Sequence, residues 1–174
     1  MAEASRVGYL IVTGTTTASR AGELVAGLLT MVEEVITIAT PHAARVIAPR
    51  ELSSMPGNRL VESYFDAAIL PRPPEGLLLV APCSFNSLNK LAQGIADNLA
   101  LSVAAEAIGR GTPVLVAVSV NAPLWHHPQA ARSVATLREW GVEVIEPVND
   151  ADGYLRLASA ETILNAVRLR SSRY

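Results

Sequence analysis

The sequence has a single cysteine, Cys83, and only three histidines among its 174 residues. One cysteine excludes an intramolecular disulfide, and the histidines stand in no metal-ligand spacing, so we expect no metal site. No apolar run approaches the roughly 18 residues that a membrane-spanning helix needs. The N-terminus also lacks the basic start and long apolar core of a signal peptide. These absences predict a cytoplasmic protein without a membrane partner.

The charges are few and nearly balanced. Fourteen basic residues, all but one of them arginine, stand against sixteen acidic residues, and no block of like charge occurs. A nucleic-acid partner, which requires a basic patch or stripe, is therefore not expected. By contrast, 50% of the residues are hydrophobic and the mean hydropathy is +0.30. These values are high for a soluble monomer of this size, so we expect a homo-oligomer that buries apolar surface between subunits.

Apolar segments typical of strands alternate with helical patterns along the whole chain. The strand-like segments are 7–12, 35–39, 76–80, 113–120 and 142–145, and the helical patterns cover 21–28, 97–109, 128–140 and 159–170. Strands that are apolar on both faces and alternate with amphipathic helices indicate a parallel sheet covered on both sides. We therefore predict the α/β fold class, with residues 1–174 forming one Rossmann-like (flavodoxin-like) domain around a doubly wound parallel sheet.

One segment lacks this alternation of strand-like and helical patterns. Residues 42–75 hold five of the eleven prolines, together with the run SSMPGN. This composition predicts a long, partly irregular excursion from the sheet. Loops of this length in a compact domain are usually functional or mobile.

Hydroxyl and amide side chains follow four of the predicted strands. They are Thr13 to Thr17 (with Gly14) after the first strand, Thr40 after the second, Ser84 to Ser87 (with Asn86) after the third, and Ser119 and Asn121 at the end of the fourth. In a parallel sheet these ends share one edge, which is where ligands bind. Hydroxyls and backbone N–H groups can hold a phosphate without Lys or Arg, and an amide can both donate to and accept from a heterocycle. The alternative is that each residue only caps a helix.

Familiar nucleotide and hydrolase motifs are missing. No G-x-G-x-x-G follows the first strand, and the sequence contains neither a P-loop nor a G-x-S-x-G elbow. We therefore do not expect a nucleoside triphosphatase or an α/β-hydrolase.

Four segments together resemble a known family. The first segment, 81–99, contains APCSFNS and GIADNL, which are similar to the P-A-S-A-N-T and G-x-A-D-N-L motifs of the flavin-containing cysteine decarboxylase superfamily. Residues 12–18 and 39–44 resemble its two phosphate loops, and residues 120–125 resemble its P-x-M-N-x-x-M-W motif. The superfamily includes phosphopantothenoylcysteine decarboxylases, lantibiotic peptidyl-cysteine decarboxylases and flavin prenyltransferases.

The resemblance implies FMN as cofactor and a trimer, or a dodecamer of trimers, with FMN at a subunit contact. It places Asn121 on the substrate carboxylate. The implied cofactor residues are Gly14, Thr15, Thr16 and Thr40 near the phosphate and Pro82, Ser84, Asn86 and Ser87 near the flavin. The implied reaction is flavin-dependent decarboxylation of a cysteine-type thiol carboxylate, such as a peptide C-terminal cysteine or a phosphopantothenoylcysteine-like molecule.

The sequence departs from the decarboxylase pattern at several positions. Ala68 stands where the decarboxylases carry a His, and Asp66 is either a substitute base or a capping residue. The Pro and the two Met around Asn121 are replaced by Val118, Val120 and Leu124. A non-catalytic FMN-binding homologue is therefore a second hypothesis.

A flavin prenyltransferase is a third hypothesis, because Pro-Cys-Ser at 82–84 is closer to that branch. Its pocket would need residues such as Arg138, Tyr154 and Arg156. Cys83 has no cationic neighbour in sequence to activate it as a nucleophile. The roles of the three histidines stay open: His42 lies beside the second phosphate loop, and His126 and His127 precede a helix that begins at a proline.

Overall fold

The central strand β4 (Leu77–Cys83) is buried at every position, as its uninterrupted apolar sequence requires. In the computed structural model, which describes residues 7–172, it lies inside a six-stranded sheet of order β3-β2-β1-β4-β5-β6. All five pairings in this sheet are parallel. The other strands are β1 (Val7–Val12), β2 (Glu34–Ala39), β3 (Asn58–Leu60), β5 (Val114–Val118) and β6 (Glu143–Ile145).

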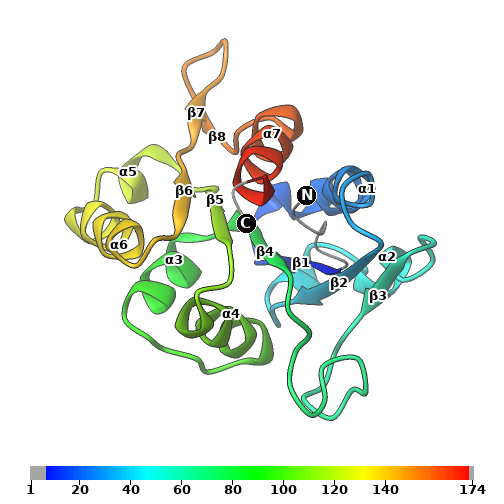
Figure 1. The fold of residues 1–174 in the computed structure, drawn as a ribbon. Coiled ribbons are helices and arrows are strands. Elements are labelled where there is room, and N and C mark those ends of the chain that lie inside the picture. The colour runs from blue at the N-terminus through cyan, green and yellow to red at the C-terminus, as the bar shows by residue number, and fades with distance from the viewer. Residues whose placement is uncertain (1–6, 173–174) are drawn as a thin grey trace.

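Helices cover both faces of the sheet (Figure 1). One face packs against α1 (Ala21–Leu28) and α7 (Ala160–Ser171), and the other against α3 (Phe85–Ala92), α4 (Leu99–Arg110) and α6 (Pro128–Glu139). Alternate residues of β4 enter the two cores: Leu77 and Leu79 face α1 and α7, whereas Leu78 and Val80 face α3, α4 and α6. The predicted doubly wound α/β fold is confirmed, although the first six and last two residues of the predicted domain lie outside the described part.

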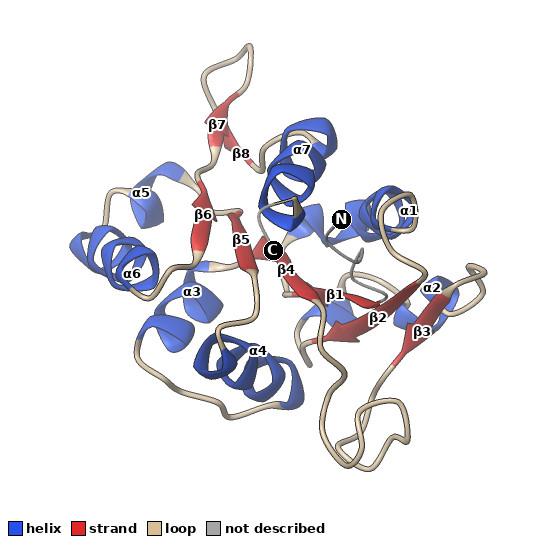
Figure 2. Ribbon diagram, viewed as in Figure 1, coloured by secondary structure: helices blue, strands red, loops and turns tan. Residues whose placement is uncertain are grey.

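The excursion at 42–75 contains more regular structure than its prolines suggest. It forms the short helices η2 (Ala43–Arg45) and α2 (Pro49–Leu52) before the edge strand β3. The Thr37 hydroxyl donates to the buried Asn58 side chain over 2.7 Å, and the Asn58 amide donates to the Leu52 carbonyl over 2.8 Å. The first bond joins β3 to β2, and the second joins β3 to the end of α2. Residues 61–76, which follow, contain no helix or strand (Figure 2).

Two further boundaries differ from the sequence prediction. The β4 strand runs on to Cys83, three residues past the predicted end, because Ala81, Pro82 and Cys83 are also buried. After β6 the chain forms a two-stranded antiparallel hairpin, β7 (Val148–Asn149) and β8 (Leu155–Arg156). This hairpin was not predicted, and it projects from the body of the domain (Figure 1).

A short helix, α5 (Ala122–Trp125), precedes α6. Within residues 7–172, no helix is long and apolar enough to cross a membrane.

Candidate functional site

The loop after β1 is fixed to the end of β4 by Thr13. This residue is fully buried, and its hydroxyl donates to the Pro82 carbonyl over 2.6 Å while accepting from the Ser84 amide N–H over 2.8 Å. The Thr13 amide N–H also donates to the Pro82 carbonyl, over 3.2 Å. The first and third polar segments predicted from the sequence therefore meet at one edge of the sheet.

The loop after β2 lies against the same region. A Cβ atom added to Gly14 would lie 2.5 Å from the His42 Cβ and 2.9 Å from the His42 carbonyl carbon, so only glycine fits there. Buried Thr40 accepts from the Ala43 N–H over 3.3 Å and thereby shapes the turn that brings His42 to Gly14. Thr16 is exposed, and its hydroxyl makes no hydrogen bond within residues 7–172. The predicted phosphate residues thus share one edge, and at least one hydroxyl is available to a ligand.

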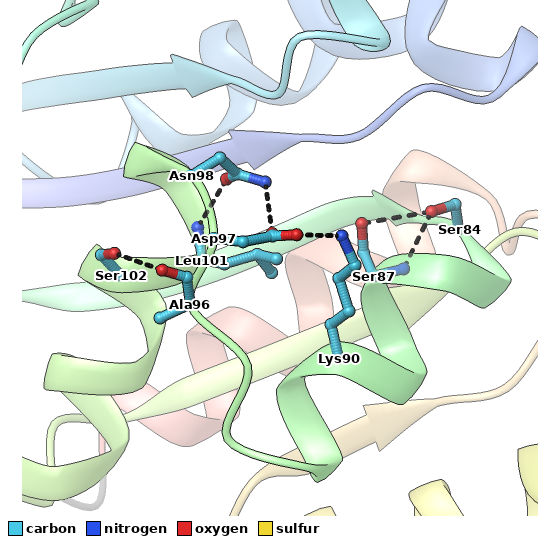
Figure 3. Close-up of polar contacts among 8 residues, drawn as sticks. All are labelled: Ser84, Ser87, Lys90, Ala96, Asp97, Asn98, Leu101 and Ser102. Atoms are coloured by element: carbon cyan, nitrogen blue, oxygen red, sulfur yellow. Dashed lines mark hydrogen bonds and ion pairs between the residues drawn. The ribbon is translucent and has the colours of Figure 1, made fainter.

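Ser84 begins α3 as its N-cap. Its hydroxyl oxygen accepts from the Ser87 amide N–H and donates to the Ser87 hydroxyl, over 3.2 Å in each case (Figure 3). Asn86 lies on the first turn of the helix, is exposed, and makes no side-chain hydrogen bond within the described part of the chain. Pro82 is buried in β4, where its carbonyl serves Thr13. Among these predicted flavin residues, the Asn86 amide is the group most open to a ligand.

Cys83 is structurally unsuited to be a nucleophile. The side chain is fully buried, and this burial raises the pKa of the thiol far above its ordinary value. The thiol donates to the Ser84 carbonyl over 3.6 Å. A thiol that stays protonated and enclosed does not attack a substrate, as the absence of a cationic neighbour in the sequence indicated.

Asn121 caps the short helix α5 at the carboxyl end of β5. Its side-chain oxygen accepts from the Leu124 N–H over 3.1 Å, while its exposed side-chain NH₂ group makes no hydrogen bond within residues 7–172. Asn121 can therefore cap the helix and bind a ligand at the same time, because the two roles use different atoms of one amide. The free NH₂ group can donate to a carboxylate.

A cavity of about 330 Å³ opens beside Thr40, between the ends of β2 and β3 and the start of α4. Ala39, Thr40, Pro41, Ala44, Pro49, Leu60, Val61, Glu62, Asn98 and Leu99 line it. Asn98 is a cavity residue that the sequence analysis did not select, although an asparagine directly before an apolar run is an N-cap signal. Its side-chain oxygen accepts from the Leu101 N–H over 3.0 Å, and the adjacent Asp97 pairs with Lys90 of α3 (Figure 3).

Other candidate residues are engaged in local structure. His127 accepts from the Gln129 N–H through Nδ1 and meets the edge of the Phe85 ring, so it caps α6. His126 is exposed. Ala68 donates its amide N–H to the Asp66 carboxylate over 2.8 Å, which commits Asp66 to a local turn.

The residues considered for a prenyl-phosphate pocket are held in separate pairs. Arg138 bonds Glu146 over 2.9 Å, and Arg156 bonds Asp150 over 2.9 Å and stacks on Tyr154 in the β7–β8 hairpin. Within residues 7–172, no hydrogen bond or ion pair joins Arg138 to either hairpin residue. The described range also contains no group of three or more His, Cys, Asp or Glu placed to hold a metal ion.

A comparison with known protein families shows which family this chain belongs to. The model of the family described as Flavoprotein matches residues 3–171. The chain belongs to the Flavoprotein family. The resemblance identified from the four sequence motifs is thereby confirmed at the level of the family.

The curated relatives of this chain include a protein named for coenzyme A biosynthesis and a protein named as a decarboxylase. The bifunctional protein CoaBC of Mycobacterium tuberculosis (strain ATCC 25618 / H37Rv) is 31% identical over 173 residues, which are 94% of this chain and 41% of that protein. The phosphopantothenoylcysteine decarboxylase of Mus musculus is 36% identical over 97 residues, which are 53% of this chain and 47% of that protein. The chain thus spans less than half of the length of these relatives.

Solved structures share the fold over nearly the whole chain. A PPC decarboxylase variant complexed with pantothenoylaminoethenethiol has a TM-score of 0.78 and 25% identity, with 95% of this chain and 97% of that chain covered. The FMN binding protein AtHal3 has a TM-score of 0.79 and 23% identity, with 95% and 96% covered. The peptidyl-cysteine decarboxylase EpiD has a TM-score of 0.76 and 22% identity, with 93% and 98% covered. The last two comparisons show the fold alone.

Proposed function

We propose that this chain binds FMN at the carboxyl edge of the sheet and decarboxylates a cysteine-type thiol carboxylate. A peptide C-terminal cysteine and a phosphopantothenoylcysteine-like molecule are the two substrate classes that fit. The observation that carries the proposal is the meeting of three polar strand ends through Thr13 and Gly14. Membership of the Flavoprotein family and the relative named phosphopantothenoylcysteine decarboxylase support it.

The residues at this edge fit a flavin mononucleotide. The first loop offers hydroxyls without an acidic side chain beside them, which suits a phosphate. Its approach to His42 leaves room only for hydrogen at Gly14. The cavity of about 330 Å³ beside Thr40 lies within the range of roughly 300–1,000 Å³ that is usual for small-molecule sites. The open amide of Asn86 can both donate to and accept from the edge of a flavin ring.

The chain's own groups have distinct roles in this proposal. Thr15, Thr16 and Thr40 hold the phosphate, while Asn86 and the α3 start orient the ring system. The free NH₂ group of Asn121 holds the substrate carboxylate. When bound, FMN would accept two electrons from the substrate thiol, which prepares the adjacent carboxylate to leave as carbon dioxide. We expect the active assembly to be a homo-oligomer, as the resemblance implies, and to be cytoplasmic, as the sequence composition predicts.

One observation favours a second candidate, a homologue that holds FMN without turnover. Ala68 offers no ionisable group where the decarboxylases carry a His, and the Asp66 carboxylate beside it is already engaged by the Ala68 N–H. A general base must lie within hydrogen-bond reach of the proton it removes. The Nδ1 atom of His127 accepts from the Gln129 N–H as the cap of α6, so this atom is not available to remove a substrate proton. The flavin prenyltransferase is the weaker alternative, because its candidate residues form separate pairs.

Substitution of Asn121 separates the capping role from carboxylate binding. Asp caps helices as well as Asn does, so Asn121→Asp should keep the fold while its charge repels the substrate carboxylate. We expect kcat/KM for a cysteine-terminated peptide to fall by roughly tenfold to a hundredfold, because one hydrogen bond to a charged group is replaced by repulsion. Release of carbon dioxide is followed as the mass loss of the peptide, and FMN binding is followed by fluorescence.

The matched control is Asn165→Asp on the exposed surface of α7, which should leave both readouts unchanged. Wild-type kinetics for Asn121→Asp would show that this residue does not hold the carboxylate. Tight FMN binding by wild-type protein, with no carbon dioxide released from any thiol carboxylate, would contradict the decarboxylase proposal and favour the non-catalytic homologue.

A further inference from the structure

Three hydroxyl groups form a continuous chain across the carboxyl edge of the sheet. The Thr15 and Thr17 hydroxyl oxygens lie 2.7 Å apart, and the Thr17 and Ser119 hydroxyl oxygens also lie 2.7 Å apart. Thr15 and Thr17 come from the loop after β1, whereas Ser119 follows β5, two residues before Asn121. The chain therefore joins the proposed phosphate loop to the segment that carries the proposed carboxylate residue.

The number of protons in this chain constrains its direction. Three hydroxyls carry three protons, and the two links use two of them. If Thr15 and Ser119 both donate to Thr17, the Thr17 proton points out of the chain. If the bonds run from Thr15 toward Ser119, the Ser119 proton points out of the chain. If they run from Ser119 toward Thr15, the Thr15 proton points out, and the Ser119 oxygen can only accept from groups outside the chain. Within the described residues, none of the three hydroxyls makes another hydrogen bond.

A bound anion selects one of these three arrangements. A phosphate can only accept, so a phosphate at Thr15 takes the Thr15 proton and forces the chain to run from Ser119 through Thr17 to Thr15. Donation from Thr17 makes Thr15 a stronger donor, because successive hydrogen bonds polarise one another in a partly buried site. The stabilisation of the phosphate then depends on two residues that need not touch it.

We propose that Thr17 and Ser119 are positioning residues that act through Thr15 to favour a phosphorylated flavin. In the same state the Ser119 oxygen, two residues before Asn121 in sequence, is left as an acceptor only. The inference rests on the proposed function, because it needs a cofactor phosphate at Thr15. A purely structural cross-link between the two loops would affect the stability of the protein without affecting its preference between a phosphorylated and an unphosphorylated flavin.

The test compares the dissociation constants of FMN and riboflavin, which differ by the phosphate, for the apo-protein at one fixed salt concentration. Thr17→Val removes the middle hydroxyl with little change in shape, and we expect it to lower the preference for FMN over riboflavin about tenfold. Ser119→Ala should lower the preference about threefold, since it weakens Thr15 only through Thr17. The double variant should show no greater loss than Thr17→Val alone, because the two residues act in series.

Two further variants separate this role from packing. Thr17→Ser keeps the hydroxyl and should restore the wild-type preference. Thr30→Val makes the same change at an exposed hydroxyl that only bonds the Gly27 carbonyl, and it should leave the preference unchanged. If Thr17→Val fails to fold, Ser119→Ala and Thr17→Ser still test the proposal.

The outcomes distinguish a failure of the proposed role of Thr17 and Ser119 from a failure of the proposed FMN binding. A wild-type preference for FMN that is kept in both Thr17→Val and Ser119→Ala overturns the inference and leaves the proposed function standing. Equal affinity of wild-type protein for both flavins also overturns the inference, because no phosphate is then recognised at Thr15. A wild-type protein that binds neither flavin overturns the proposed function itself, and the inference with it.

Discussion

At the scale of single residues, the site depends on small groups that allow two loops to meet. The closest approach is at Gly14, where His42 leaves no space for a side chain. Thr13 adds two hydrogen bonds that fix the same loop to β4. The sequence places both residues in a Thr-rich loop after a strand, and the family resemblance places Gly14 near a phosphate. Their contacts were not predictable, because these come from segments far along the chain.

Substitution of Gly14 by Ala should separate these loops. The added methyl group would meet backbone atoms of His42, which cannot move aside as a flexible side chain could. We expect a loss of about 1–3 kcal/mol in the free energy of unfolding, the usual cost of overpacking, and at least tenfold weaker FMN binding. Urea unfolding and a fluorescence titration with FMN measure the two effects.

Gly109 provides a matched control, because a Cβ at this position in α4 meets no atom within 4 Å. Gly109→Ala should be neutral or stabilise the protein by up to about 1 kcal/mol, since Ala is the better helix former. If Gly14→Ala behaved like Gly109→Ala in both measurements, the close approach of the two loops would not be needed for the site.

At the scale of elements, periodicity predicted the long and apolar segments and failed for the short ones. The strand β1 was predicted at its observed bounds, and the helices α4, α6 and α7 were predicted to within two residues at each end. The strand β3 was missed because its three residues show no alternating pattern and its place depends on the distant Thr37–Asn58 bond. The end of β4 was missed because Pro82 and Ser84 suggested a loop where tertiary burial extends the strand to Cys83.

The β7–β8 hairpin depends on one carboxylate. Asp150 accepts from the Arg156 side chain and from the amide N–H groups of Tyr154 and Asp152, and these bonds, with Arg156 the largest cause, lower the pKa of Asp150 below its ordinary value of 3.8. A lowered pKa in the folded state means that ionised Asp150 favours the hairpin above about pH 3.8. This contribution is lost as the pH falls through the folded-state pKa.

We therefore expect the hairpin to open at acid pH before the sheet unfolds. Hydrogen exchange of the Tyr154 amide should accelerate below about pH 3.8, after correction for intrinsic rates, while the amides of β4 remain protected. Asp150→Asn should show the open behaviour already at pH 7. An Asp150→Asn protein with wild-type protection of Tyr154 at neutral pH would show that the carboxylate does not hold the hairpin.

At the scale of the whole molecule, the two apolar cores account for only part of the hydrophobic residues. Several large apolar side chains remain at the surface, and three of them lie in the segment after β3: Tyr64, Phe65 and Leu70, with Phe65 87% exposed. This segment borders the cavity beside Thr40 through Val61 and Glu62. An apolar surface next to the proposed cofactor site is what the predicted assembly, with FMN at a subunit contact, would require.

The predicted trimer gives a direct expectation for the mass in solution. Light scattering should report at least three times the chain mass of 18.4 kDa. Phe65→Asp should reduce the mass to that of the monomer, because a charge in an apolar contact remains unpaired. The exposed Leu169 of α7 lies outside this segment, so Leu169→Asp serves as the control. A monomeric wild-type protein would contradict the predicted assembly.

The outline of the candidate site was predictable from the sequence, since strands that run parallel have their carboxyl ends at one edge of the sheet. The Thr17–Ser119 bond and the Asn98 cavity wall were not predictable, because they depend on how loops from different strands close over that edge. Local patterns carry no information about such contacts.

The central claim is that these gathered hydroxyl and amide groups hold FMN. The most direct measurement is the visible absorption spectrum of the purified protein, with mass spectrometry of the ligand released on denaturation. We predict a flavin spectrum and the mass of FMN, either as purified or after addition of micromolar FMN, and loss of that spectrum in Asn86→Leu. A colourless protein that does not take up added FMN would contradict the claim.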